Sequence, residues 1–202
     1  FRSHALNPEH PLMRGTVQNP DVFFQVREAC NPYYDALPQI VEDYFLKINA
    51  ITGRSYHLFN YYGTPDAKNV IVAMGSVSGA VKEAVDSLNA KGEKTGFVQV
   101  HLYRPFSAEH LLKALPQSVE RIAVLDRCKE PGSAGEPLYE DVCSVIINSD
   151  RKITVVGGRY GLSSKDTDPG QILSVFANLS TQNPKNGFTI GITDDVTHLS
   201  LP

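Results

Sequence analysis

Residues 69–85 decide the fold, and they read Asn-Val-Ile-Val-Ala-Met-Gly-Ser-Val-Ser-Gly-Ala-Val-Lys-Glu-Ala-Val. The apolar run 70–74 has the length of a buried strand, and a turn of small residues follows it. Val81, Ala84, Val85 and Leu88 then recur at helical spacing, up to Gly92, which can take the left-handed position after a helix. A strand, a tight turn and a helix form the repeating unit of α/β folds, and the same layout also holds phosphates in nucleotide-binding proteins.

The alternation of strand and helix continues to the end of the chain. Further strands are expected at 96–103, 122–125, 153–156 and 188–192, which makes five with 70–74. Helices between them are expected to begin at Ser107, at Pro137 and at Asp168-Pro169. The sequence therefore predicts an α/β fold with a five-stranded, mostly parallel sheet and helices on both faces.

Residues 1–56 have a different texture, and we expect two domains, 1–56 and 57–202. Residues 1–16 show no periodicity and are expected to form an extended arm. Asn19-Pro20 and Asn31-Pro32 can each supply an N-cap and a first helical residue. Helices are expected at 21–30 and 33–49. An arm and two helices bury little apolar surface, so this section must pack against other polypeptide.

Composition excludes several classes of function. The chain has 202 residues, 42% of them apolar, and a formal net charge of −3, so no attraction to nucleic acid or to an anionic membrane is expected. No apolar run approaches bilayer length. Three cysteines without a C-x-x-C pair argue against a zinc or iron–sulfur site and against a disulfide framework, and a reducing cytoplasm is expected. The start at Phe1 and the end at Pro202 suggest a piece of a longer protein.

The small-residue turn does not match a known nucleotide-binding motif. Gly75 and Gly79 are wrongly spaced for a dinucleotide fingerprint, and no carboxylate ends the second strand, which closes with His101-Leu-Tyr-Arg104. No Gly-Lys-Ser/Thr triplet supports a P-loop, because Ala80 follows Gly79. We interpret this turn as structural.

The segment Gly157–Lys165, Gly-Gly-Arg-Tyr-Gly-Leu-Ser-Ser-Lys, is a better candidate site. It follows the fourth strand at the sheet edge where α/β folds place ligands. Glycine amides, two hydroxyls, Arg159 and Lys165 all suit an anion such as a phosphate or the tail of coenzyme A. The same residues suit a loop that docks another domain. We favour docking, because no acid, base or metal ligand accompanies them.

Three other groups of residues are weaker candidates for a site. Cys128 is a conceivable nucleophile, because Arg127 and Lys129 would lower its pKa, but a structural or contact loop is favoured for 126–137. Asp194-Asp195 could bind a divalent cation, although a turn is favoured. The six histidines show no metal-ligand spacing, and solvated or core positions are expected for all of them: His4, His10, His57, His101, His110 and His198.

Several long motifs resemble a known family over essentially all 202 residues. They occupy residues 10–21, 27–33, 98–106, 124–132, 136–139, 157–165, 194–196 and 200–202. Together they resemble pyruvate:ferredoxin (flavodoxin) oxidoreductase. The resemblance implies that 1–56 come from the end of the domain that accompanies the pyrimidine of thiamine. It implies that 57–202 form a domain similar to the C-terminal domain of transketolase.

The resemblance also implies the reaction of the whole enzyme. Such enzymes convert pyruvate and coenzyme A to acetyl-CoA and CO₂, and pass electrons to ferredoxin or flavodoxin. They use thiamine diphosphate with Mg²⁺ and iron–sulfur clusters of the 4Fe–4S type, and the full enzyme is expected to be a homodimer. The chain lacks the Gly-Asp-Gly of a thiamine diphosphate site. We therefore expect no catalytic, cofactor-binding or metal-binding residue here, and a scaffold role among neighbouring domains.

Three alternatives remain open at this stage. The chain could be a self-contained α/β module that binds a phosphate or coenzyme A at Gly157–Lys165. It could be the same domain of an oxidoreductase for another 2-oxoacid, since nothing here reads the side chain of the substrate. A flavodoxin-like carrier is disfavoured, because the first turn lacks the Ser/Thr run that wraps a flavin phosphate.

Overall fold

A computed structural model describes residues 7–9 and 17–202 of the chain. The chain divides into two compact units, Phe1–Leu37 and Pro38–Pro202. Most of the expected arm at 1–16 lies outside the described residues. Helix α1 (Pro20–Glu28) begins as expected, because the side chain of Asn19 accepts a hydrogen bond from Val22 N at 2.9 Å. Helix α2 (Asn31–Thr52) includes Asn31 as a helical residue, so Asn31 is not the N-cap that its sequence suggested.

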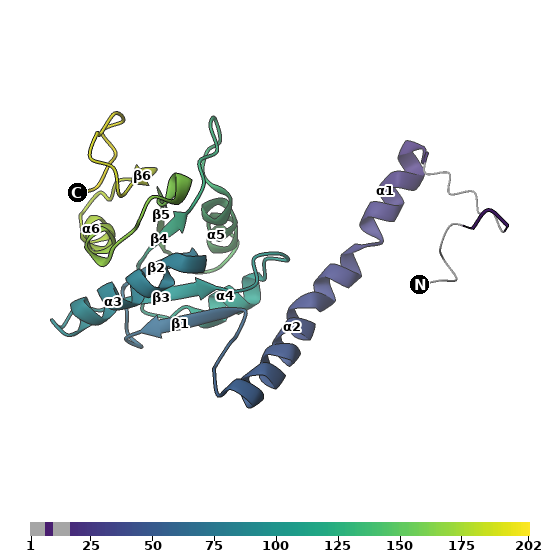
Figure 1. Cartoon of the computed structure of the whole chain (residues 1–202), viewed down its shortest axis with the longest axis horizontal. Coiled ribbons are helices and arrows are strands. Elements are labelled where there is room, and N and C mark those ends of the chain that lie inside the picture. The colour runs from purple at the N-terminus through teal and green to yellow at the C-terminus, as the bar shows by residue number, and fades with distance from the viewer. Residues whose placement is uncertain (1–6, 10–16) are drawn as a thin grey trace. The chain divides into compact units, whose positions relative to one another are not determined.

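The described residues build one mixed, mostly parallel sheet of six strands in the order β1-β3-β2-β4-β5-β6 (Figure 1). All neighbouring strands run parallel except β1, which pairs with β3 in the antiparallel sense. The strands are β1 (Phe59–Gly63), β2 (Asn69–Met74), β3 (Thr95–Val100), β4 (Arg121–Asp126), β5 (Thr154–Arg159) and β6 (Phe188–Thr189). The predicted α/β class is confirmed.

The sheet has one strand more than the five predicted. Strand β1 was missed because Phe-Asn-Tyr-Tyr-Gly contains no Val/Ile run, and its burial fades from Phe59 to Gly63 along the sheet edge. The last strand is shorter than expected, since regular pairing covers Phe188–Thr189 rather than 188–192. The fourth strand is longer, because β5 continues through Gly157 and Gly158 to Arg159.

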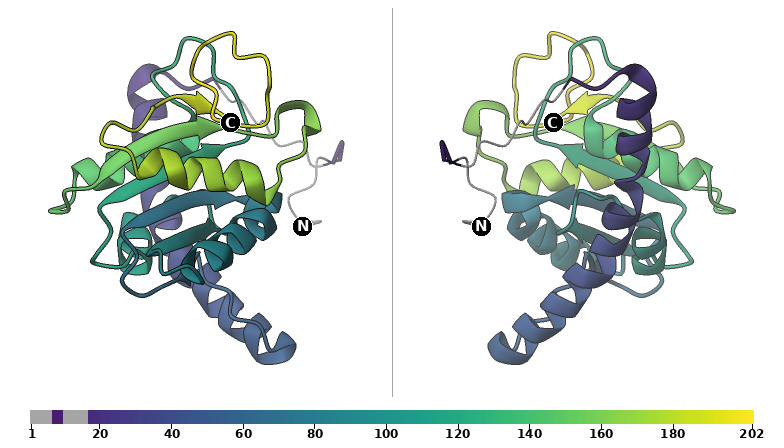
Figure 2. Two further views of the ribbon diagram at one scale, coloured as in Figure 1. Left: turned by 90° about the vertical axis from the view of Figure 1, so that its left-hand side faces the viewer. Right: turned by 90° about the vertical axis from the view of Figure 1, so that its right-hand side faces the viewer.

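Helices cover both faces of the sheet, and they do so in pairs. Helices α3 (Ser78–Asn89) and α6 (Pro169–Leu179) lie side by side on one face, as Figure 2 shows. Helices α4 (Ala108–Ala114) and α5 (Pro137–Ile147) cover the other face. Alternate residues of β2 point to the two sides, so that Ile71 and Ala73 join the first core and Val70 and Val72 the second. The second core also takes Val41 and Phe45 from α2.

Local signals in the sequence predict the ends of two helices correctly. Asp168 accepts a hydrogen bond from Gln171 N at 2.9 Å and Pro169 opens α6, as the sequence predicted. Gly92 has a φ of +87°, as expected for a glycine just beyond the C-cap of α3. None of the helices within 17–202 is long and apolar enough to cross a bilayer.

Candidate functional site

The strand order creates a switch point at the carboxyl end of the sheet. From β2 the chain passes to β3 on one side, and it then crosses to β4 on the other side of β2. In open α/β sheets the crevice at such a reversal is the usual place for a ligand. Here it is bordered by the turn after β2, the loop after β4 and the segment Tyr160–Lys165.

The turn after β2 has the geometry of a structural turn. Gly75 has a φ of +78°, in the region that favours glycine. The hydroxyl of Ser78 donates to the carbonyl of Gly75 at 2.7 Å, and Gly79 is already part of α3. The position of Gly75 is thus explained by the reversal from strand to helix, whereas Gly79 has an ordinary helical backbone.

Gly157 and Gly158, the first two glycines of the Gly157–Lys165 motif, belong to strand β5, which corrects the expectation that the motif follows the strand. Gly157 N donates to the side-chain oxygen of Asn186 at 2.7 Å, and both glycines pair with β4. The ring of Tyr139 lies against Gly157, and the ring of Phe188 covers Gly158. These amides and this surface are already occupied, so they do not form an anion cradle.

Arg159 is also used inside the domain. Its guanidinium lies 3.2 Å from the carboxylate of Glu136, and it donates to the carbonyl of Gly187. The side chains of Arg159 and Glu136 are only 12% and 4% exposed, and Lys129 lies 3.9 Å from the same carboxylate. Arg159 therefore joins β5 to the start of α5 and to the approach to β6.

Lys165 is the cation of the motif that keeps its freedom to bind, because its ammonium group makes no ion pair or hydrogen bond with the described part of the chain. It borders a polar cleft of about 190 Å³ with Ser76 and Arg127, and an apolar cleft of about 210 Å³ with Leu162 and Ile192. Arg127 Nε donates to Gly161 O at 2.9 Å. This edge offers the ammonium group of Lys165 beside apolar surface.

Asp126 ends β4 and holds the start of α5. Its two carboxylate oxygens accept hydrogen bonds from Leu138 N at 3.0 Å and from Tyr139 N at 3.1 Å. The side chain of Glu136, at the N-cap position, makes no such bond, so Asp126 supplies the cap from the neighbouring strand. Burial raises the pKa of Asp126, while the two amides work against the rise.

Cys128 is not an activated thiol, which corrects the idea that Arg127 and Lys129 lower its pKa. Burial raises the pKa of Cys128, and the carboxylates of Asp126, Glu130 and Glu136 raise it further. Asp126 and Glu130 stand beside Cys128 in the sequence, but the burial of the thiol and the approach of Glu136 follow only from the fold.

The Asp194-Asp195 pair forms a turn. Asp195 accepts a hydrogen bond from Ser200 N at 3.0 Å, and this bond lowers its pKa. Val196 N bonds back to Asp194 O at 3.0 Å. Across residues 7–9 and 17–202, no three His, Cys, Asp or Glu side chains gather as a metal site. Cys30, Cys128 and Cys143 do not form a cluster-binding set, so the described residues do not fit an iron–sulfur cluster.

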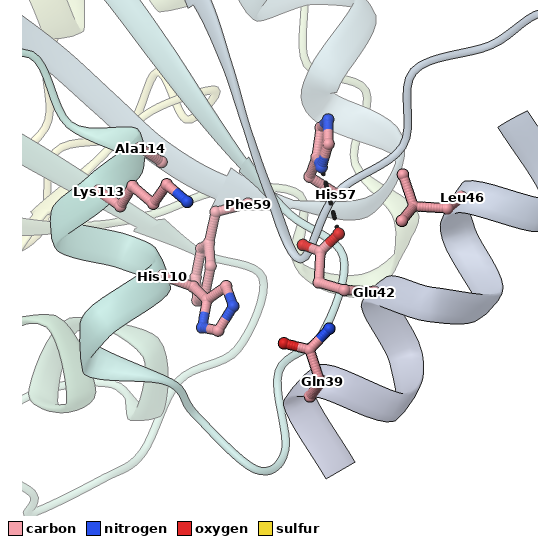
Figure 3. A pocket seen from close by; sticks show the side chains of 8 residues that line it. All are labelled: Gln39, Glu42, Leu46, His57, Phe59, His110, Lys113 and Ala114. Carbon is pink, nitrogen blue, oxygen red and sulfur yellow. Dashed lines mark hydrogen bonds and ion pairs between the residues drawn. The ribbon is translucent and has the colours of Figure 1, made fainter. Parts of the chain in front are cut away.

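A larger pocket lies at the edge of the second core, between α2, α4 and β1 (Figure 3). Its volume is about 440 Å³. Its lining side chains come from α2 (Gln39, Glu42, Leu46), from the segment that enters β1 (His57, Phe59) and from α4 (His110, Lys113, Ala114). Glu42 Oε1 accepts from Leu58 N at 2.8 Å and Oε2 lies 3.2 Å from His57 Nδ1. No sequence pattern indicates this pocket, because its residues come from three segments and His57 and His110 lie far apart in the chain.

Comparison with known proteins identifies the family. The family model for the core domain II of pyruvate:ferredoxin oxidoreductase matches residues 67–172. The chain belongs to the pyruvate:ferredoxin oxidoreductase family, as its core domain II. It is 60% identical over its whole length to the pyruvate-flavodoxin oxidoreductase of Enterobacter agglomerans. It is 61% identical to the pyruvate:ferredoxin oxidoreductase of Moorella thermoacetica, again over its whole length.

The chain spans only 17% of the length of these two curated relatives. A 2-oxoglutarate:ferredoxin oxidoreductase from Magnetococcus marinus is a looser structural neighbour. Its TM-score is 0.42 at 17% identity, over 62% of this chain and 20% of that one, a likeness too weak to bear on function.

Proposed function

We propose that this chain is a non-catalytic scaffold between the domains of a pyruvate:ferredoxin (flavodoxin) oxidoreductase. One observation carries the proposal. At the carboxyl edge of the sheet, where α/β folds bind ligands, Arg159, Gly157 and Asp126 already bind groups of the same domain. These three groups thus join elements of the domain to one another. Residues 1–56 would belong to the end of the preceding domain, and 57–202 would form the α/β domain.

The activity of the whole enzyme would then depend on polypeptide beyond this chain. The relatives are named for pyruvate and for ferredoxin or flavodoxin, which supports oxidation of pyruvate with coenzyme A to acetyl-CoA and CO₂. Thiamine diphosphate, Mg²⁺ and iron–sulfur clusters would bind in other domains, since the described residues fit no cluster. A homodimeric, cytoplasmic enzyme is the form that we propose.

Lys165 would serve as a docking residue in this scaffold. It stands beside the exposed side chains of Leu162 and Ile192, a pairing that suits a neighbouring domain with a carboxylate next to apolar residues. The alternative occupant is a phosphate or coenzyme A tail. It is less favoured, because the amide of Gly157 and the guanidinium of Arg159 are not available to hold it. An oxidoreductase for another 2-oxoacid would use the same scaffold.

An activity assay tests the scaffold role. The purified chain would be supplied with pyruvate, coenzyme A, thiamine diphosphate, Mg²⁺ and oxidised ferredoxin, and acetyl-CoA would be measured by mass spectrometry. The expected result is no acetyl-CoA above a control without protein. Formation of acetyl-CoA in proportion to the amount of chain would refute the proposal.

A further inference from the structure

We propose that the pocket between α2, β1 and α4 binds a small monocarboxylate, a carboxylate carried on a short apolar body. The pocket volume of about 440 Å³ falls in the range of small-molecule sites. Such sites combine apolar walls with a few convergent polar groups. Figure 3 shows that combination, with imidazole and ammonium groups facing the side chains of α2 across the pocket. The site does not depend on the scaffold function.

One wall of the pocket offers donors to an oxyanion. The ammonium group of Lys113, an exposed residue of α4 that lines the pocket, makes no hydrogen bond or ion pair with residues 7–9 and 17–202. His110, one turn earlier on α4, has its Nδ1 2.7 Å from the hydroxyl of Ser107. When that hydroxyl donates to Nδ1, the ring carries its proton on Nε2, which is then a donor for a ligand.

The opposite side places a second imidazole with one free nitrogen. Nδ1 of His57 lies 3.2 Å from Glu42 Oε2, so Nε2 is the nitrogen left for a ligand. The carboxylate fixes the orientation of the ring. The ammonium group of Lys113 and the imidazole of His110 thus supply the donors from α4, and the imidazole of His57 lines the pocket from the entry to β1.

Apolar side chains supply the rest of the lining. Phe59 is buried at the start of β1, and Leu46 and Ala114 complete the surface. A small inorganic oxyanion, which has no hydrocarbon part, would leave the apolar lining of the pocket in contact with water. A short hydrocarbon body would cover it, and burial of each CH₂ improves binding about fourfold.

The carboxylate of Glu42 favours a ligand with a single negative charge over one with two. Both of its oxygens already accept hydrogen bonds, from Leu58 N and from His57, so the carboxylate stays in place as a fixed negative charge. It repels a dianion more strongly than a monoanion. A metal ion is not the better occupant, because the described side chains form no metal site here. An organic cation would be repelled by the ammonium group of Lys113. A monocarboxylate therefore fits better than a phosphate.

The test is a titration of the chain with butyrate, followed by the ring signals of the histidines in ¹H–¹³C NMR spectra. We expect saturable shifts of the His57 and His110 signals and none at His198, which lies near the β6 edge. Acetate should bind about fifteenfold more weakly than butyrate, since it lacks two CH₂ groups. Butylphosphonate as a dianion should bind more weakly than butyrate, and butylammonium should not bind.

Two variants in the pocket and one control variant make the titration specific. Lys113→Met should weaken butyrate binding at least tenfold, whereas Lys91→Met, which removes another exposed lysine, after α3, should leave it unchanged. His110→Gln should weaken binding as well, and circular dichroism melts would confirm that each variant folds. Absence of saturable shifts at tens of millimolar butyrate would overturn the proposal, as would equal weakening by Lys91→Met.

A second arm distinguishes a free ligand from a side chain of another domain. The same titration is repeated on the full-length enzyme that carries the chain. Butyrate binding in both proteins supports a site for a free monocarboxylate. Binding to the chain alone would overturn it, because a neighbouring domain would then fill the pocket.

Discussion

The guanidinium of Arg159 lies 3.2 Å from the carboxylate of Glu136, and the two side chains are almost fully withdrawn from water. Glu136 stands at the start of α5 and Arg159 at the end of β5, so the pair ties a helix to the sheet at its carboxyl edge. The sequence suggested that Arg159 could bind an external anion, but in the fold its charge is balanced by Glu136 of the same domain.

Replacement of Arg159 by Leu should destabilise the domain. The change leaves the carboxylate of Glu136 buried, with only the more distant Lys129 near it, and such a loss costs about 3 kcal/mol or more. Urea unfolding followed by circular dichroism measures the change. Lys165→Met is the matched control, because the Lys165 side chain has no internal partner in 17–202, and it should change stability by less than about 0.5 kcal/mol. Equal stability of the Leu variant and the wild type would contradict the internal role of Arg159.

Two glycines should respond in opposite ways to alanine. A Cβ at Gly158 would overlap the ring of Phe188, which is fully buried, so Gly158→Ala should cost about 1–3 kcal/mol. A Cβ at Gly79 would meet open space inside α3, so Gly79→Ala should be neutral or stabilise by up to about 1 kcal/mol. Thermal melts of the two variants provide the comparison. A destabilising Gly79→Ala would show that the turn after β2 needs glycine for a reason other than backbone geometry.

The stability contributed by Asp126 should depend on pH with a definite sign. Burial raises the pKa of Asp126 in the folded state, so the folded chain binds this proton more tightly than the unfolded chain does. Stability therefore falls as pH rises from the ordinary carboxyl value of about 4 through the raised value. The variant Asp126→Asn has no titrating group at this position. The unfolding free energy of the wild type minus that of the variant should decrease as pH rises from about 4 to neutrality, and an increase would be inconsistent with a raised pKa.

Cys128 should react slowly with iodoacetamide. Its raised pKa leaves less thiolate at neutral pH than an ordinary thiol has, and the thiolate is the reacting form. Mass spectrometry of the peptide that contains Cys128 gives the alkylation rate, and the same chain in urea supplies the control. We expect the rate to increase on unfolding. If Cys128 in the folded chain is alkylated faster than free glutathione, the raised pKa is contradicted and a nucleophilic role for Cys128 is supported.

The sequence predicted the class of fold and most of the sheet. Apolar runs identified the central strands β2 and β4 most clearly, because parallel strands buried on both faces are rich in Val, Ile, Leu and Ala along their whole length. Strand β1 was not predicted, because it is an antiparallel edge strand of mainly aromatic and polar residues, and its second half is exposed to solvent. Gly157 and Gly158 resemble loop residues, since glycine is rare in strands, and only the rings packed on them explain their place in β5.

The site could be predicted less well, because its contacts join distant residues. The bond from Leu138 to Asp126 crosses a loop, and the pair of Arg159 with Glu136 joins segments that no local pattern connects. The pocket of Glu42, His57 and His110 gathers residues from α2, the entry to β1 and α4. Periodicity reports the secondary structure of each segment separately, and it says nothing about which side chains meet.

Isothermal titration calorimetry with coenzyme A tests the scaffold role most directly. The chain is titrated with coenzyme A and, as a matched pair, so is Lys165→Ala. If the polar groups at the carboxyl edge serve only to hold the domain together and to dock its neighbours, neither protein will give a saturable heat at millimolar ligand. A saturable binding curve for the chain that disappears in Lys165→Ala would contradict this account and show a ligand site at the end of β5.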